Sequence, residues 1–334
     1  MKMTTGLPDE EFRSEDQVDT GKFSLVAQEL FNHQIKNWKL AADGYQSLSA
    51  VHIKKFKFDN FSIEAHFNPG RIISSSAKVD AKSISERPCF LCKENLPYDQ
   101  KAVKINENYI LLVNPYPIFN THFTIPSVNH VPQLILSEMG NMLSISKMLG
   151  KNYSVFYNGP ECGASAPDHL HIQAGDFGFM KIDTEHESMA RAYGKTVYQE
   201  NDLKTTAVQG CLRNYFSVES EDKTKLTAEF QKIFYALQNG KSRLEPMMNI
   251  ICNYNSRWRL LIFPRSNHRP GYFYEEGENN ILVSPAAVDL GGVMIFPRDK
   301  DFSKISAELI KDIFMQVTLS GARFGAVADK LGNR

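Results

Sequence analysis

The sequence contains no long hydrophobic run among its 334 residues. A membrane-spanning helix needs about 18 or more consecutive apolar residues, so we expect no transmembrane segment and no membrane partner. Residues 1–19 are polar and acidic and lack the apolar stretch of a secretory signal. We therefore predict a cytoplasmic protein.

Net charge is also lacking, because 38 lysines and arginines balance 38 aspartates and glutamates. Non-specific nucleic-acid binding needs a basic surface that displaces counterions, so we expect no nucleic-acid partner. Cysteine is sparse, and an odd number in a chain of this length does not indicate a disulfide framework. The five positions are Cys89, Cys92, Cys162, Cys211 and Cys252.

The remaining composition is typical of a soluble globular protein, with 42% hydrophobic and 23% charged residues. Apolar spacing predicts helices mixed with strands and hairpins. This mixture favours an α+β fold of antiparallel sheets flanked by helices over a doubly wound parallel sheet. Helices are expected at 23–40, 134–149, 227–237 and 305–319, and strands at 61–67, 109–113, 122–126, 153–157, 169–174, 248–253, 258–263, 281–283 and 292–296.

The length predicts about two domains. We expect a flexible arm at residues 1–19 and a first lobe, which carries the active site, at residues 20–205. A second lobe is expected at residues 222–334, and the polar, weakly patterned residues 200–223 mark the boundary.

The most informative segment is His169-Leu170-His171-Ile172-Gln173. Alternate side chains of a strand share a face, so the two histidines and the glutamine are expected on one face, opposite the leucine and isoleucine. A lone buried histidine is more often a core residue than a catalyst. Two imidazoles and a carboxamide on one face are typical of a functional site.

The loop before this segment supplies Gly159, Gly163 and Ser165. Glycines let backbone N–H groups approach an anion closely, and serine adds a hydroxyl donor, which points to phosphate. A neutral imidazole beside phosphate can attack phosphorus as a nucleophile. Gln173 can donate a hydrogen bond to a phosphoryl oxygen but cannot act as a general acid. The pattern therefore suits a leaving group that departs as phosphate.

The His-Leu-His-Ile-Gln motif, preceded by Asn158, Gly159, Gly163 and Ser165, resembles the histidine-triad superfamily. It looks like the nucleotidyltransferase branch, which has glutamine where the hydrolases carry a third histidine. That branch includes galactose-1-phosphate uridylyltransferase, diadenosine tetraphosphate phosphorylase and the GDP-hexose phosphorylases. The resemblance implies two histidine-triad-like lobes, the second one degenerate.

The resemblance also implies roles for individual residues. His171 would form a covalent nucleotidyl intermediate, and Gln173 and Ser165 would contact phosphate. Asn114 lies in Val113-Asn114-Pro115-Tyr116-Pro117, which resembles the strand and loop that hold the nucleotide; a common turn residue is the alternative. The nucleotide-binding residues implied are Asn114, Asn158, Gly159 and Gly163.

Cys89 and Cys92 are separated by two residues, the gap that lets two thiolates bind one zinc ion. A redox pair and two ordinary buried thiols are the alternatives. His130 and His169 are the best candidates for the remaining ligands. Together the four residues resemble the structural zinc site of the uridylyltransferases, in which the first histidine of the pair is a ligand.

The sequence therefore predicts a nucleotidyltransferase of the phosphorylase or uridylyltransferase type. The donor would be a nucleotide sugar or a dinucleoside polyphosphate, and the acceptor would be phosphate or a sugar 1-phosphate. The alternatives are a histidine-triad hydrolase and a zinc-stabilised nucleotide-binding module without catalysis. The base, the sugar and the oligomeric state stay open.

Overall fold

The computed structural model describes residues 20–72, 80–238 and 244–333, so the predicted arm at residues 1–19 lies outside it. The described helices are α1 (Thr20–Asn37), α2 (Lys39–Ser47), α4 (Ala81–Ser85), α5 (Met139–Leu149), α6 (Lys181–Tyr193), α7 (Lys223–Leu237), α8 (Ala287–Leu290), α9 (Asp299–Lys304), α10 (Ala307–Val317) and α11 (Gly321–Gly332). The described strands are β1 (His52–Lys57), β2 (Ser62–Phe67), β3 (Ala102–Lys104), β4 (Ile110–Val113), β5 (His122–Pro126), β6 (Tyr153–Asn158), β7 (His171–Asp176), β8 (Gly194–Glu200), β9 (Leu203–Val208), β10 (Tyr215–Ser220), β11 (Met248–Asn255), β12 (Arg257–Pro264) and β13 (Val293–Phe296).

Ten of the described strands form one antiparallel sheet in the order β3-β4-β5-β7-β6-β11-β12-β10-β9-β8. The first five strands in this order precede the last five in the chain. Each group follows one pattern along the chain: three strands, a helix (α5 or α7) and two more strands. Strands β6 and β11 join the halves, with Asn158 opposite Asn249. In this arrangement β12 occupies the place of β7, and β12 contains no histidine.

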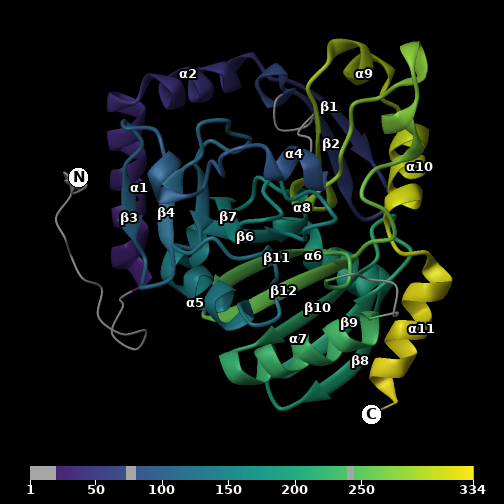
Figure 1. Ribbon diagram of the computed structural model, residues 1–334. Helices are drawn as coiled ribbons and strands as arrows, with labels where there is room; N and C mark the ends of the chain where they lie inside the picture. Colours follow the sequence, from purple (N-terminus) through teal and green to yellow (C-terminus); the bar gives the residue numbers. More distant parts are fainter. Residues whose placement is uncertain (1–19, 73–79, 239–243, 334) are drawn as a thin grey trace.

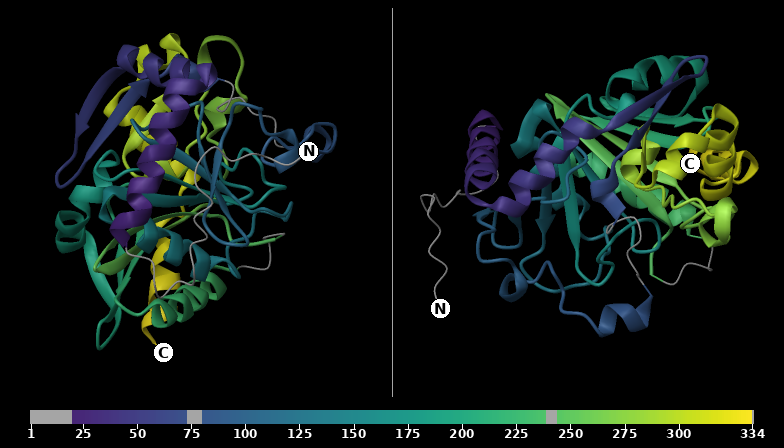
Figure 2. Two further views of the ribbon diagram at one scale, coloured as in Figure 1. Left: turned by 90° about the vertical axis from the view of Figure 1, so that its left-hand side faces the viewer. Right: turned by 90° about the horizontal axis from the view of Figure 1, so that it is seen from above.

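The large sheet lies between two layers of covering elements (Figures 1 and 2), and a hydrophobic core fills each side. Helices α1, α5, α7 and α11 pack on one face through residues such as Leu30, Leu143 and Phe230. The other face is covered by α6, α8, α9, α10 and a second sheet of order β1-β2-β13. The N-terminal hairpin β1–β2 and the C-terminal strand β13 thus lie side by side, since β13 pairs with β2.

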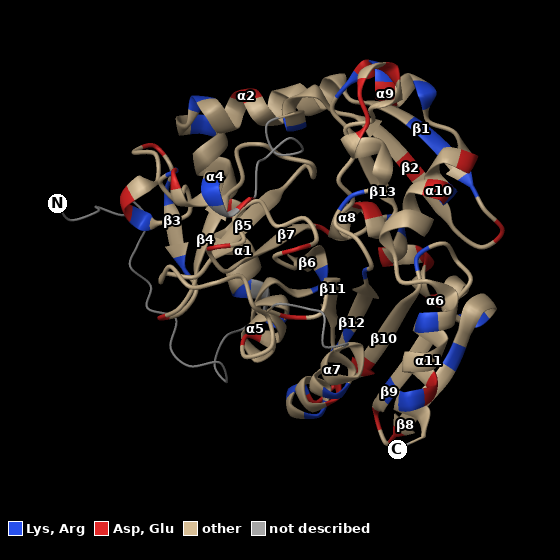
Figure 3. Ribbon diagram, turned by 45° about the vertical axis from the view of Figure 1, so that its right-hand side comes forward, with Lys and Arg blue, Asp and Glu red and all other residues tan. Residues whose placement is uncertain are grey.

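The predicted α+β class with antiparallel sheets flanked by helices is confirmed. Strand β5 lies at the predicted residues, and β2, β4, β6, β11, β12 and β13 begin and end within two residues of the prediction. Figure 3 shows Lys and Arg interspersed with Asp and Glu on α7 and α9, as balanced charge implies. No helix of the described residues has the length and hydropathy needed to cross a membrane.

The helix predictions need corrections at their ends. The helix expected at 23–40 is interrupted at Trp38, whose backbone is extended, so that α1 and α2 are separate. The helix expected at 134–149 begins at Met139. The helix expected at 305–319 ends at Val317, and α11 follows it. Residues 281–283 form no strand, because the N–H groups of Ile281 and Val283 donate to the carbonyls of Tyr272 and Ile281 and not to a neighbouring strand.

The polar segment at 200–223, which we expected to mark the boundary between the lobes, holds β9 and β10 of the large sheet. Its polar pattern is compatible with burial because the hydroxyl of Thr205 donates to buried Glu229 at 2.7 Å. Strands of both halves belong to this one sheet, so the sheet itself does not mark where one lobe ends and the next begins. The division into lobes at 205 and 222 stays a prediction.

Candidate active site

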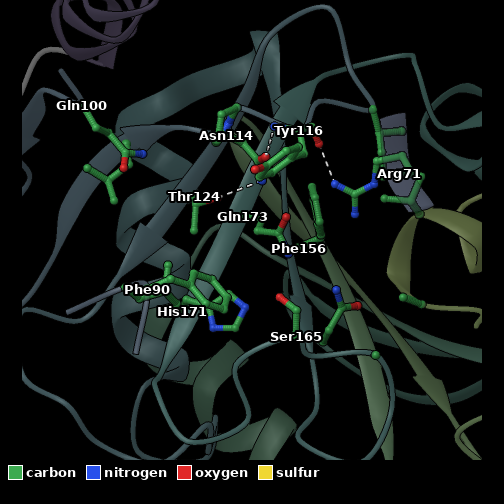
Figure 4. A pocket seen from close by; sticks show the side chains of 18 of the residues that line it. Arg71, Phe90, Gln100, Asn114, Tyr116, Thr124, Phe156, Ser165, His171 and Gln173 are labelled. Carbon is green, nitrogen blue, oxygen red and sulfur yellow. Dashed lines mark hydrogen bonds between the residues drawn. The ribbon is translucent and has the colours of Figure 1, made fainter. Parts of the chain in front are cut away.

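One cavity of about 650 Å³ opens on the face of the large sheet that carries the second sheet. Most of its lining is apolar or neutral, and it is of the size of small-molecule sites. Six residues that the sequence predicts for the site line it: Asn114, Asn158, Gly163, Ser165, His171 and Gln173. Figure 4 shows His171, Gln173 and Ser165 facing the same space, with Gln100 and Arg71 toward opposite ends.

His171 is the first residue of β7, and the residue is 3% exposed. Its Nδ1 donates to the carbonyl oxygen of His169 at 2.8 Å, because a carbonyl can only accept. The proton is thereby placed on Nδ1, which leaves the lone pair of Nε2 for the cavity. Burial lowers the pKa of His171 to about 4, although the carbonyl opposes this change. The ring is therefore neutral at pH 7 and able to act as a nucleophile.

Gln173 lies two residues further on the same face of β7, as the strand period predicts. Its Oε1 lies 3.0 Å from Nε2 of His122 on β5. Its amide nitrogen has no hydrogen-bond partner within the described part of the chain. Gln173 therefore presents two N–H donors next to the imidazole of His171.

His169 does not share this face, so the prediction that it lies in the strand with His171 and Gln173 is wrong. Strand β7 begins only at His171, and a turn closed by the bond from His169 N–H to Ala166 C=O precedes it. The turn rotates the His169 imidazole away from the cavity and toward the two cysteines. Its Nδ1 lies 3.3 Å from Sγ of Cys89.

The loop before β7 is held by contacts with the second half of the chain. The side-chain oxygen of Asn158 accepts from the Asn249 amide and from the Ala287 N–H, both at 2.8 Å. Gly163 has φ +107°, and a Cβ there would lie 2.7 Å from Cβ of Ala286, so this position requires glycine. Ser165 is tethered through its carbonyl, which accepts from Arg87 at 3.2 Å.

Two of the residues predicted to bind the nucleotide make close contacts within the protein itself. Gly159 is not among the lining residues, and a Cβ there would lie 2.9 Å from both Sγ of Cys162 and the Met248 carbonyl. Asn114 lines the cavity but uses both ends of its amide locally. It donates to the Thr124 hydroxyl at 3.0 Å and accepts from the Tyr116 N–H at 2.9 Å. Its contact with a nucleotide stays a prediction.

Cys89, Cys92, His130 and His169 form a cluster whose four ligand atoms lie within 4.8 Å of one another. Sγ of Cys92 lies 3.1 Å from Nδ1 of His130 and 3.5 Å from Nδ1 of His169. A tetrahedral zinc ion with bonds of about 2.3 Å to sulfur and 2.0–2.1 Å to nitrogen would separate these atoms by about 3.5 Å. The cluster therefore fits a metal ion.

The surroundings of the cluster also suit a metal ion. Ligating histidines usually donate their second N–H to a carbonyl or carboxylate, which fixes the ring. His169 does so through Nε2, which lies 2.8 Å from the carbonyl of Ser127. Nε2 of His130 lies 3.5 Å from a carboxylate oxygen of Asp168.

Sequence reasoning missed two residues that support the site, one behind His171 and one in the cavity wall. Gln133 is fully buried; its Oε1 accepts from the His171 N–H at 2.7 Å and its Nε2 donates to the His171 carbonyl at 2.9 Å. Arg71 lines the cavity and donates to the Tyr116 carbonyl. A single glutamine or arginine has no sequence signal that would have revealed either role.

Arg71 brings a positive charge to the cavity wall. No carboxylate among residues 20–72, 80–238 and 244–333 forms an ion pair with it. The nearby acid Asp289 is occupied, since its two oxygens accept from the N–H groups of Ala286 and Ile295 at 2.8 and 3.2 Å. Burial raises the pKa of Asp289 to about 6, which weakens it further as a counter-ion. An anionic ligand would complete this arrangement.

Comparisons with known proteins found two family models that match successive parts of the chain. Residues 30–176 match a family model described as a domain of unknown function, DUF4922, and residues 191–333 match one described as the GDPGP1-like C-terminal domain. No curated protein matches the chain.

The solved structures give a similarity over most of the chain. Yeast Ap4A phosphorylase Apa2 in complex with AMP superposes with a TM-score of 0.61 at 15% identity, covering 89% of this chain and 96% of that chain. Its structure in complex with Ap4A gives 0.56 at 13% identity, covering 89% and 97%. The same enzyme in a third structure gives 0.58 at 16% identity, covering 89% and 94%.

At this identity the structural similarity shows the fold. Together with the GDPGP1-like domain, it confirms the resemblance that the His-Leu-His-Ile-Gln motif indicates. The chain therefore has the same fold as Ap4A phosphorylase, and its C-terminal part matches a GDPGP1-like domain.

Proposed function

We propose that the protein is a nucleotide phosphorylase that transfers a nucleotidyl group to phosphate through a covalent intermediate on His171. The donor is a dinucleoside polyphosphate or a nucleotide sugar. The observation that carries the proposal is a neutral, oriented imidazole beside a carboxamide on one strand face, in the wall of one cavity. The structural similarity to a phosphorylase in complex with Ap4A and AMP supports the dinucleoside polyphosphate as the first donor to test.

In the first step, the lone pair of His171 Nε2 attacks the α-phosphorus of the donor. The phosphorus–oxygen bond to the rest of the polyphosphate breaks, and its electron pair leaves with that oxygen. With diadenosine tetraphosphate, this step gives adenylyl-His171 and releases ATP. The leaving phosphate needs no proton, which agrees with a glutamine in place of a third histidine. The carbonyl of His169 stabilises the positive charge that develops on the ring.

In the second step, an oxygen of orthophosphate attacks the same phosphorus and the phosphorus–nitrogen bond breaks, which restores His171 and gives ADP. Phosphoryl-type transfer depends mainly on positioning and on stabilising the charge of the equatorial oxygens. Gln173 and Ser165 are proposed to donate to these oxygens, and Arg71 supplies positive charge in the same wall. A sugar 1-phosphate would serve as acceptor by the same chemistry.

We further propose that the metal of the cluster is zinc, because two thiolates and two imidazoles favour that ion. Cys89, Cys92, His130 and His169 would hold it, and a closed site with four protein ligands has a structural role. A redox function of the two cysteines is the competing interpretation, and it would leave the purified protein without bound metal.

Product analysis separates the proposed function from its alternatives. Incubation of the protein with diadenosine tetraphosphate and orthophosphate is expected to give ATP and ADP in equal amounts. Equal amounts of ATP and AMP, whether or not orthophosphate is present, would identify a hydrolase. Tight binding without any product would favour a nucleotide-binding module. His171→Ala is the matched control for background hydrolysis.

A further inference from the structure

A second histidine, His122, contacts the candidate site from behind Gln173. It is the first residue of β5, its side chain is fully buried, and its ring packs against both Phe119 and Phe156. The ring centroids are 5.1 Å and 6.0 Å from those of the two phenylalanines. The backbone of His122 is held as well, since its N–H donates to the Tyr45 hydroxyl at 3.1 Å. The imidazole therefore has one fixed orientation.

The two ring nitrogens of His122 have different partners. The N–H of Ile118 donates to Nδ1 at 3.2 Å, so Nδ1 carries no proton. The single proton of the neutral ring must then lie on Nε2, which is 3.0 Å from Oε1 of Gln173. Burial, followed by the positive charge of Arg71, lowers the pKa of His122 to about 3, which keeps the ring neutral at pH 7.

This chain of hydrogen bonds fixes the amide of Gln173. If the amide were flipped, its NH₂ group would face the N–H of His122, and two donors would oppose each other. The observed orientation turns the NH₂ group away from His122 and toward the cavity that Gln173 lines.

We propose that His122 is a positioning residue that orients Gln173, so that the Gln173 amide donates to a non-bridging oxygen of the transferred phosphoryl group. The proposal rests on the proposed function and assigns to that site a residue outside its lining. His122 touches neither the cavity nor the reacting atoms, so its effect passes through Gln173 alone.

The test compares the rate at which the protein becomes nucleotidylated by diadenosine tetraphosphate. His122→Leu removes the donor and is expected to slow the reaction about 100-fold, which is typical of a misplaced catalytic group. His122→Gln places an N–H donor at a similar reach and is expected to recover most of the rate. In a Gln173→Ala background, His122→Leu is expected to cause no further loss.

Phe123→Leu is the control for stability, because Phe123 is equally buried on the same strand but faces the opposite core. It is expected to lower the melting temperature and leave the rate of the folded protein unchanged. Equal losses in His122→Leu and His122→Gln, or additive losses with Gln173→Ala, would overturn the positioning role.

A second measurement does not depend on activity. In ¹⁵N-histidine-labelled protein, the ring of His122 is expected to carry its proton on Nε2, with His122→Gln assigning the signal. A proton on Nδ1 would overturn the proposal. If the wild-type protein forms no adduct with a donor that binds, the proposed function fails, and the role of His122 in phosphoryl transfer fails with it. The ¹⁵N spectrum would still show whether Nε2 of His122 carries the proton that it donates to Gln173.

Discussion

The carbonyl oxygen of His169 accepts the Nδ1–H of His171 at 2.8 Å, while the imidazole of His169 lies 3.3 Å from the thiol of Cys89. One residue therefore joins the cluster of cysteines and histidines to the candidate nucleophile. Its side chain faces the cluster and its backbone sets the tautomer of His171. The cluster is thus expected to affect both stability and catalysis, although its ligands do not line the cavity.

Loss of the metal is expected to slow nucleotidylation. In Cys92→Ala, the bound metal should fall from one ion per chain to near zero, and the melting temperature should drop. Because the turn at His169 loses its anchor, we expect the rate to fall between about 10- and 100-fold. Metal analysis beside single-turnover kinetics checks this, with Cys252→Ala as the control because Cys252 is buried away from the cluster. A metal-free Cys92→Ala with full activity would contradict the link through His169.

The pH dependence of nucleotidylation reports on His171. Its lone pair is lost on protonation, so the rate must fall as pH falls through the pKa of the folded protein. Burial lowers that pKa to about 4, well below the ordinary value of about 6.5 for histidine. We expect a constant rate from about pH 8 to pH 5 and a decline at lower pH. Metal content should be measured at each pH as a control. A decline centred near pH 6.5 would show that His171 is not desolvated as the structure indicates.

Replacement of Gln173 tests whether its amide donates a hydrogen bond to the phosphoryl group or only fills space. Gln173→Ala removes the amide that faces the phosphoryl group and should lower kcat about 100-fold with little change in KM. Gln173→Glu keeps an oxygen that can accept from His122 but offers the substrate a negative charge, so its loss should be larger. A Gln173→Glu variant with the wild-type rate would refute donation by this amide.

The sequence predicts the parts of the site that depend on local periodicity. Alternation along β7 places His171 and Gln173 on one face, and the spacing of Cys89 and Cys92 predicts their cluster. It does not predict that His169 leaves the strand, because that depends on the turn from Ala166 and on contacts with distant thiols. The same limit applies to the buried polar side chains of β9 and β10, since Thr205 depends on Glu229 of α7 and Ser217 on His186 of α6.

His122 and Gln133 show the same limit more strongly. His122 finds Gln173 51 residues further along the chain, and Gln133 finds His171 38 residues further. Neither partner is implied by propensity or by a motif. Only the pairing of β5 with β7 and the path of the loop before α5 bring these side chains together.

Gln133 yields a prediction about stability and rate together. Gln133→Leu leaves the N–H and C=O of His171 and the C=O of Asn158 without a buried partner. Each such group costs about 1–3 kcal/mol, so the free energy of unfolding should fall by about 3 kcal/mol or more. The rate of the folded protein should also fall, because the start of β7 loses its anchor.

Gln34→Leu is the matched control for this variant. Gln34 is also fully buried and bonds two backbone groups, the Asp99 carbonyl and the Lys101 N–H, but it does not bond His171. Denaturant unfolding should show a loss of stability for both variants, whereas only Gln133→Leu should slow nucleotidylation. Equal rates in the two variants would remove Gln133 from the support of His171.

The most direct test of the covalent mechanism is the intact mass of the protein after incubation with diadenosine tetraphosphate and a panel of nucleotide sugars in the absence of phosphate. The account predicts that the wild-type protein gains the mass of one nucleoside monophosphate, that added orthophosphate removes it, and that His171→Ala gains nothing. The absence of an adduct with a donor that demonstrably binds, or an adduct that persists in His171→Ala, would contradict it.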